Sequence, residues 1–177
     1  MLLTTPNGTV TIRPAQQTDA PAFRELRLEA LRHHPEAFRS DYQLNEAKPL
    51  TAWTDRVRLR QPEGSELIAF ATHTEQLIGM SGITPGNSPK TQHSAYIWGV
   101  YVQPEWRGWH LAEGLITVCL EWAQLQGVRV VKLGVVTSNT AAIRCYTRLG
   151  FRAYGVEPQA LYHQSTFYDE LLMSRSL

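Results

Sequence analysis

Hydrophobic residues recur at intervals of three and four positions in several stretches of the chain, which is the spacing of amphipathic helices. The pattern is clearest where a long helix is expected to end near a glycine, Gly127. It predicts helices that open at Thr18 or Asp19 and end near His33, and that cover residues 51–60, 111–125 and 140–149. The intervening residues 33–50 are expected to be irregular or weakly helical.

Alternating or continuous runs of β-branched and aromatic residues predict strands between these helices. The strands are expected at residues 10–12, 66–72, 76–84, 94–102, 128–136, 151–156 and 166–173. Turns are expected at residues 61–64 and 73–75, and a loop around Pro158. This order of elements predicts a mixed α/β fold, with residues 1–177 forming a single domain.

Composition and charge exclude several classes of protein. The 177 residues are 43% hydrophobic and 19% charged, which is ordinary for a globular domain. The 17 basic residues are interspersed among 16 acidic ones, and the net charge of +1 disfavours nucleic acid as a partner. Neither a leader-like start nor a run of about 18 apolar residues is present, so we expect a cytoplasmic protein with no membrane partner.

Cysteine and histidine give no sign of metal or disulfide chemistry. Cys119 and Cys145 both lie in apolar helical patterns and are expected to be core residues. The six histidines show no spacing typical of zinc ligands, so no metal is expected.

The first segment with candidate chemistry is residues 102–112, which join a predicted strand to the long helix and contain Gly108. A strand that runs through such a loop into a helix N-terminus presents unpaired N–H groups and a favourable dipole to an anion. The segment indicates a phosphate-binding loop, and an ordinary strand-to-helix turn is the alternative.

The second segment is residues 139–151, in which Asn139 stands at the start of a helix and Gly150 just beyond its end. Ala142, Tyr146 and Leu149 share one face of this helix. From this segment alone, Tyr146 is expected to be a core residue with its hydroxyl at the rim.

Together the two segments resemble the signatures of the GNAT superfamily of N-acetyltransferases. Arg107 and Ala112 match the ends of Arg/Gln-x-x-Gly-x-Gly/Ala, after Val-x-Pro-Glu at residues 102–105. Residues 139–151 match Asn-x-x-Ala-x-x-x-Tyr-x-x-x-Gly-Phe at every defined position. The sequence is also similar to a bacterial branch with Pro-Glu-Ala-Phe (35–38), Trp-Gly-x-Tyr-Val (98–102) and Phe-Tyr-Asp-Glu (167–170).

The resemblance implies a mixed, mostly antiparallel sheet of six to seven strands, flanked by about four helices, with a central pair of strands splayed at a bulge. It implies acetyl-CoA as the acyl donor, with the pantetheine arm inserted between the splayed strands. The donor-binding residues that it implies are Val100, Tyr101, Val102, Arg107, Gly108, Trp109, His110, Leu111, Ala112, Asn139 and Tyr146.

His110 departs from the signature because it stands where the family has its central glycine. If this position has a positive φ, a β-carbon there costs conformational energy. If the position is already helical, the cost is small. A histidine could also donate a hydrogen bond to a phosphate.

The chemistry implied by the resemblance is direct attack of a primary amine on acetyl-CoA in a ternary complex. The amine must be neutral to attack, and the departing thiolate leaves more easily beside a proton donor. Tyr146 is the expected general acid. No carboxylate occurs in residues 95–102, so the base stays open among Glu36, His93, Glu157 and Glu170.

The acceptor is expected to be a small-molecule amine, such as an amino acid, a polyamine or an aminoglycoside-like antibiotic, or a protein or peptide amine such as an amino terminus. The expected aromatic walls of its pocket are Phe38, Tyr42, Trp98 and Tyr168. A non-catalytic acyl-CoA-binding sensor is the alternative function. The chain lacks the Gly-x-Gly-x-x-Gly of dinucleotide-binding oxidoreductases. Edge strands leave a homodimer open.

Overall fold

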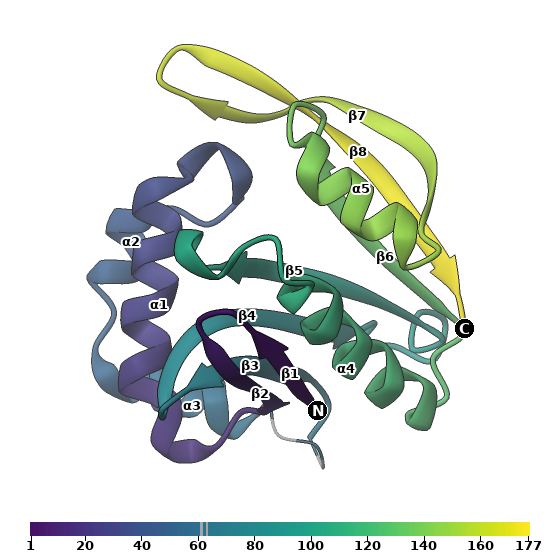
Figure 1. The fold of residues 1–177 in the computed structure, drawn as a ribbon. Helices are drawn as coiled ribbons and strands as arrows, with labels where there is room; N and C mark the ends of the chain where they lie inside the picture. Colours follow the sequence, from purple (N-terminus) through teal and green to yellow (C-terminus); the bar gives the residue numbers. More distant parts are fainter. Residues whose placement is uncertain (61, 63) are drawn as a thin grey trace.

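A computed structural model describes residues 1–60, 62 and 64–177. Within this part of the chain, one mixed sheet has eight strands in the order β1-β2-β3-β4-β5-β6-β8-β7 (Figure 1). The strands are β1 (Leu2–Thr5), β2 (Gly8–Pro14), β3 (Leu67–His73), β4 (Gln76–Pro85), β5 (Ser94–Val102), β6 (Val130–Val136), β7 (Arg152–His163) and β8 (Thr166–Ser176). All neighbouring pairs are antiparallel except β5 and β6.

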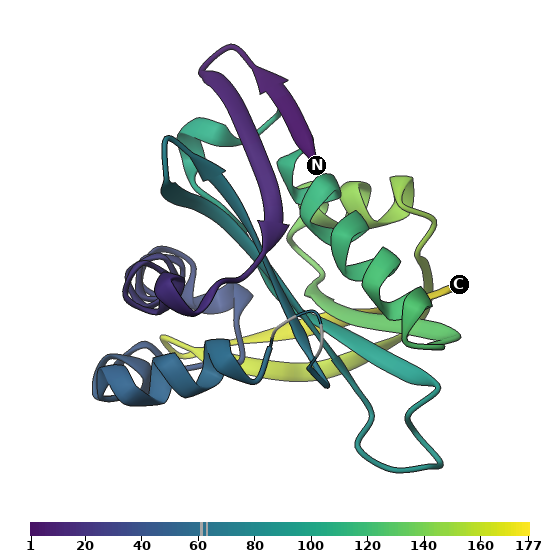
Figure 2. The same ribbon diagram turned by 90° about the horizontal axis from the view of Figure 1, so that it is seen from below.

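Helices cover both faces of the sheet. They are α1 (Ala20–His33), α2 (Tyr42–Glu46), α3 (Leu50–Arg58), α4 (Leu111–Leu125) and α5 (Thr140–Arg148), with short 3-10 turns η1 (Gln17–Asp19), η2 (Pro35–Ala37) and η3 (Pro104–Trp106). Figure 2 shows α1 and α3 on one face and α4 and α5 on the other. Each face has its own hydrophobic core, one around Phe23, Trp53 and Phe70 and one around Ile12, Leu115 and Cys119.

The mixed α/β class is confirmed, with one strand more than expected and five α-helices instead of about four among the described residues. The additional strand, β1, is short and half polar, so it carries little periodic signal. The fifth helix, α2, is short and lies in the stretch expected to be irregular or weakly helical. Of the turn expected at residues 61–64, Gln61 and Glu63 lie outside the described residues.

The expected loop around Pro158 is wrong. β7 continues through Pro158 to His163, and the hairpin instead turns at Gln164 and Ser165, which both have positive φ. Proline cannot donate a ladder hydrogen bond, but it is tolerated on edge strands and at bulges. β7 is an edge strand, and its register against β8 shifts between Glu157 and Leu161, so both conditions are met.

The central strands β5 and β6 separate after a short stretch of parallel pairing. They pair only from Ser94 with Val130 to Tyr96 with Lys132, and Figure 1 shows them diverging from there. On its other side, β5 shifts register against β4 between Met80 and Gly82, where β5 carries one extra residue. Gly99 lies in this bulge with a φ of 68°, a conformation that favours glycine. The expected splayed pair is therefore present.

Candidate active site

A cavity of about 680 Å³ lies along the gap between β5 and β6. Its wall includes residues 97–102 of β5, residues 133–136 of β6, the start of α4 and one face of α5. The predicted site residues among its lining are Phe38, Trp98, Val100, Tyr101, Val102, Arg107, Gly108, His110, Leu111, Ala112, Asn139 and Tyr146. Segments far apart in the sequence therefore meet at one hollow.

Three of the predicted residues do not line this cavity. Trp109 points to solvent, with 44% of its surface exposed. Tyr42 lines a second hollow of about 480 Å³, between the α1–α2 region and the tip of the β7–β8 hairpin, and Phe38 lines both hollows. Tyr168 lies on β8 opposite Leu161 and lines neither.

The loop before α4 turns through two residues in the left-handed region. Gly108 has a φ of 85° and His110, the N-cap of α4, has a φ of 60°. The first N–H groups of a helix have no intrahelical partner, and the helix dipole adds positive potential there. The cavity wall includes Leu111 and Ala112 of this first turn, so the wall can accept an anion.

His110 thus meets the condition under which its β-carbon costs conformational energy. Its Nδ1 lies 3.1 Å from Oε1 of Glu113, and the same carboxylate accepts hydrogen bonds from Arg148 of α5. Burial raises the pKa of Glu113, but the hydrogen bonds from Arg148 and His110 outweigh it, so the net pKa is lowered. Glu113 therefore links the start of α4 to α5 through its hydrogen bonds with Arg148.

Arg107 holds the loop against β5. Its Nε donates to the carbonyl oxygen of Val102 at 2.9 Å, and its Nη2 lies 3.0 Å from Nε2 of His34. The guanidinium also lies 5.7 Å from the ring centre of Tyr101. A cation is therefore fixed at the junction between β5 and the turn before α4.

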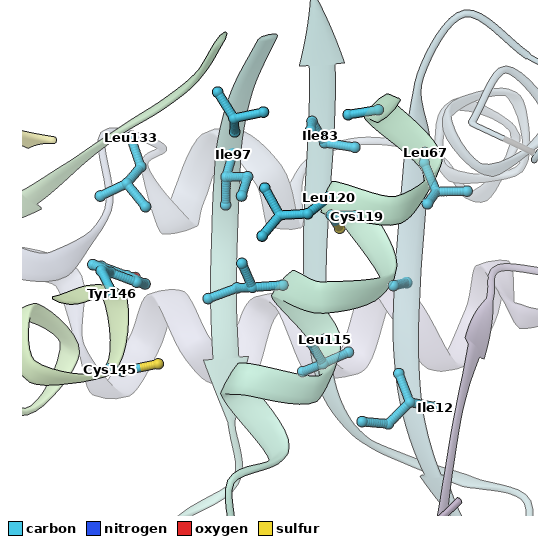
Figure 3. Close-up of a cluster of buried hydrophobic side chains, with 14 of the residues drawn as sticks. Ile12, Leu67, Ile83, Ile97, Leu115, Cys119, Leu120, Leu133, Cys145 and Tyr146 are labelled. Carbon is cyan, nitrogen blue, oxygen red and sulfur yellow. The ribbon is translucent and has the colours of Figure 1, made fainter. Parts of the chain in front are cut away.

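At the start of α5, Asn139 caps the helix by accepting the backbone N–H of Ala142 at 3.1 Å. One face of α5 turns inward, and Figure 3 shows Tyr146 and Cys145 among the core side chains. Tyr146 is 7% exposed, and its hydroxyl has no hydrogen-bond partner among the described residues. Burial raises the pKa of Tyr146, so the phenol keeps its proton at neutral pH.

The four residues left open as bases occupy different places. Glu36 lines the cavity. His93 precedes β5 at the paired end of the splay, where its carbonyl oxygen accepts from Arg129. Glu157 and Glu170 form ion pairs with the same Arg39 nitrogen, at 2.5 and 2.6 Å. Only Glu36 of these four therefore faces the cavity.

Two polar residues of α1 near the site were missed from the sequence. Glu29 accepts hydrogen bonds from the hydroxyl of Tyr101 and from Nε2 of Gln103, both at 2.8 Å. Arg27 is 3% exposed and stands four residues from Phe23 and from Leu31, both buried. The sequence does contain a signal for Arg27, because a charged residue stands among the apolar positions of one helix face.

Residues 22–151 match the model of the acetyltransferase (GNAT) family. The chain belongs to this family. Mycothiol acetyltransferase of Brachybacterium faecium is 29% identical over 147 residues, which are 81% of this chain and 41% of that protein. The chain spans less than half the length of the curated relatives it matches.

Solved GNAT structures have the same fold. A GNAT-family acetyltransferase of Streptococcus pneumoniae matches with a TM-score of 0.85 at 21% identity, over 95% of this chain and 99% of that one. YncA of Salmonella typhimurium, solved with its cofactor acetyl-CoA, matches with a TM-score of 0.80 at 22% identity, over 95% and 94%. Within the described residues, no helix is long and apolar enough to cross a bilayer, and no cluster of three or more ligating side chains could hold a metal.

Proposed function

We propose that residues 1–177 form one N-acetyltransferase domain that moves an acetyl group from acetyl-CoA to a primary amine by direct attack in a ternary complex. The observation that carries the proposal is the cavity between β5 and β6, which joins the anion-accepting turn of α4 to Tyr146. Acetyl-CoA bound in the structure of YncA supports the choice of donor. A cytoplasmic location and a homodimer stay predictions.

The residues of the cavity fit an acyl-CoA donor. The first turn of α4, with Gly108 and Arg107 before it, would hold the pyrophosphate. The side of β5 that β6 leaves unpaired after Tyr96 would offer backbone groups of residues 100–102 to the pantetheine arm. Asn139 and Tyr146, on the opposite wall, would lie beside the arm and the sulfur.

Acyl transfer requires protons to move at two places. The amine nitrogen forms a bond to the thioester carbon and loses a proton, while the carbon–sulfur bond breaks and the sulfur gains one. Tyr146 would supply the proton to sulfur, since its buried phenol stays protonated. Backbone N–H groups of β5 would polarise the carbonyl oxygen. Glu36 is the base that its position in the cavity favours, acting directly or through water.

A non-catalytic acyl-CoA sensor remains the second candidate. The feature that favours it is His110, which has left-handed backbone where the family signature has glycine. A sensor would bind acetyl-CoA without releasing thiol in the presence of any amine.

Calorimetry with acetyl-CoA and a thiol-release assay over an amine library test the proposal together. We expect saturable binding that weakens in Arg107→Glu, because the change places a negative charge beside the anion site. Arg129→Glu is the matched control, because Arg129 is exposed and lies outside the cavity lining. Absence of binding at millimolar donor would overturn both candidates, and binding without thiol release would favour the sensor.

A further inference from the structure

The Arg27 guanidinium is buried without an anionic partner among the described residues. Its Nε and Nη1 have no hydrogen-bond partner among the described residues, and the side chain forms no ion pair there. Leaving a buried charge unpaired is costly, so natural proteins seldom retain one without a role. Burial, followed by the charge of Arg56, lowers the pKa of Arg27 to about 9.

Positive charge dominates the surroundings of Arg27. Arg56 and Arg60 lie 5.2 and 5.7 Å from the ring centre of Trp98, which packs against the hydrophobic core beneath α1. Glu66 pairs with Arg60 at 2.7 Å, and its charge also acts on Arg56. Burial, followed by the charge of Arg60, also lowers the pKa of Arg56, to about 10. Among the described residues, the cluster therefore carries a net positive charge.

The guanidinium of Arg27 borders the cavity wall. It lies 4.7 Å from the ring centre of Phe38, and its Nη1 would lie 3.3 Å from a β-carbon built on Gly99. Phe38, Trp98 and Gly99 all line the cavity. Arg27 is itself buried and does not line the cavity, but because Gly99 has no side chain, no β-carbon separates this part of the wall from its guanidinium.

We propose that Arg27 binds a carboxylate of the acceptor, and that the substrates are therefore amines that carry a carboxylate, such as free amino acids. The inference rests on the proposed acetyl transfer and narrows its acceptor. A carboxylate matches the planar fork of a guanidinium and accepts two N–H donors at once. Ion pairing to Arg27 would fix one end of the acceptor while its amine reaches the thioester.

The charge cluster decides between the classes of amine left open by the sequence. Polyamines and aminoglycoside-like molecules carry several positive charges, which the arginines would repel. A protein amino terminus is followed by an amide and has no nearby carboxylate. A small amino acid brings the missing negative charge together with the nucleophile.

The test compares matched acceptors with acetyl-CoA: amino acids, their carboxamides, the amines lacking the carboxylate, and spermidine. We expect the wild type to favour the best amino acid over its carboxamide by about ten- to hundredfold in kcat/KM, which is typical of a hydrogen bond to a charged group. Arg27→Met should bring that ratio close to one and leave the rate with the carboxamide nearly unchanged. Arg24→Met, a half-buried position of α1 where the arginine pairs with Glu25, is the matched control and should keep the ratio.

Several outcomes would overturn the proposal. Carboxamides or spermidine as the better acceptors of the wild type would do so, as would an equal loss with both acceptors in Arg27→Met, which indicates a structural role. Arg27→Lys keeps the charge without the fork, so it should show a partial loss of the ratio even if Arg27→Met does not fold. Calorimetry of the same amino acids on the protein saturated with CoA separates the two proposals: selective, Arg27-dependent binding without turnover would overturn the transferase and retain the carboxylate site.

Discussion

The two sides of the cavity are built from different materials. The proposed donor side consists of β5, the first turn of α4, β6 and the start of α5, all within residues 94–146, and it offers mainly backbone groups. The other side is lined by side chains of His34, Glu36, Phe38 and Trp98, with α1 and α3 packed behind Phe38 and Trp98. A site made of backbone leaves a local sequence signal, whereas a site made of side chains leaves residues scattered along the chain.

The largest effect is expected from a substitution in the hydrophobic core that lies beneath the acceptor side only. Trp53 of α3 is 1% exposed and packs edge-on against Phe23 at 5.3 Å. We expect Trp53→Ala to lower the free energy of unfolding by about 3–5 kcal/mol, as for other large-to-small core changes. Chemical denaturation measures the loss, and Trp53→Phe, which keeps an aromatic ring, should lose less.

If the two sides are separable, folded Trp53→Ala protein should raise the KM for the acceptor more than the Kd for acetyl-CoA. The reason is that Trp53 belongs to the core on the α1 and α3 face, whereas the α4 turn and α5 pack on the other. Equal weakening of both ligands would show that the sides are not independent.

The next largest effect is expected at Tyr146, on the donor side near the proposed position of the thioester. Tyr146→Phe removes the hydroxyl and keeps the ring against Phe151, so stability and donor affinity should change little. Turnover should fall by about ten- to hundredfold, the lower end of general acid catalysis, because a thiolate leaves fairly well unaided. The loss should appear in kcat, since the proton is needed in the transition state. Unchanged single-turnover rates would return Tyr146 to a packing role.

How well the sequence predicts each part follows the same division. The bounds of β5 and α4 were predicted as observed, because a run rich in aromatic and β-branched residues ends at Pro104 and a regular apolar stripe ends before Gly127. The splayed pair required the family resemblance, since no local pattern encodes which strands separate. Tyr42 and Tyr168 were expected at the acceptor pocket because they are aromatic, but type alone does not fix where a side chain lies.

Arg27 shows why the acceptor side escaped sequence reasoning. Its burial depends on α1 packing against the sheet beside Gly99, which is far from Arg27 along the chain. The expectation of a loop around Pro158 was wrong for a similar reason. A proline is compatible with a strand only where the topology leaves that strand at the edge.

A smaller effect is expected at His110, whose backbone in the turn before α4 adopts a conformation that favours glycine. His110 holds a φ of 60°, where glycine is favoured over other residues by about 1 kcal/mol. His110→Gly should therefore raise the free energy of unfolding by roughly that amount, less the contact with Glu113. Thermal unfolding should shift upward by a few degrees.

His110→Ala separates the backbone from the ring, because it keeps the β-carbon and should give no gain in stability. The strain is already present without donor, so its relief alone should leave the Kd for acetyl-CoA unchanged. Equal weakening of donor binding in the Ala and Gly variants would instead indicate that the ring contacts phosphate. A Gly variant no more stable than the Ala variant would contradict the strain.

The smallest effect concerns Glu113, whose side chain ties the donor turn to α5 through His110 and Arg148. Its net pKa in the folded protein lies below 4.5. A lowered folded-state pKa contributes stability that is fully present above the unfolded value and is lost as the pH falls through the folded one. Stability should therefore decline below about pH 4.5 more steeply in the wild type than in Glu113→Gln.

The difference in the free energy of unfolding at neutral pH should be under about 1 kcal/mol, because the partners His110 and Arg148 are largely exposed. Glu121→Gln, an exposed position on α4, is the matched control, and urea unfolding from pH 3 to 7 gives the curves. Parallel curves for the wild type and Glu113→Gln would mean that the carboxylate adds nothing to a turn held by its backbone alone.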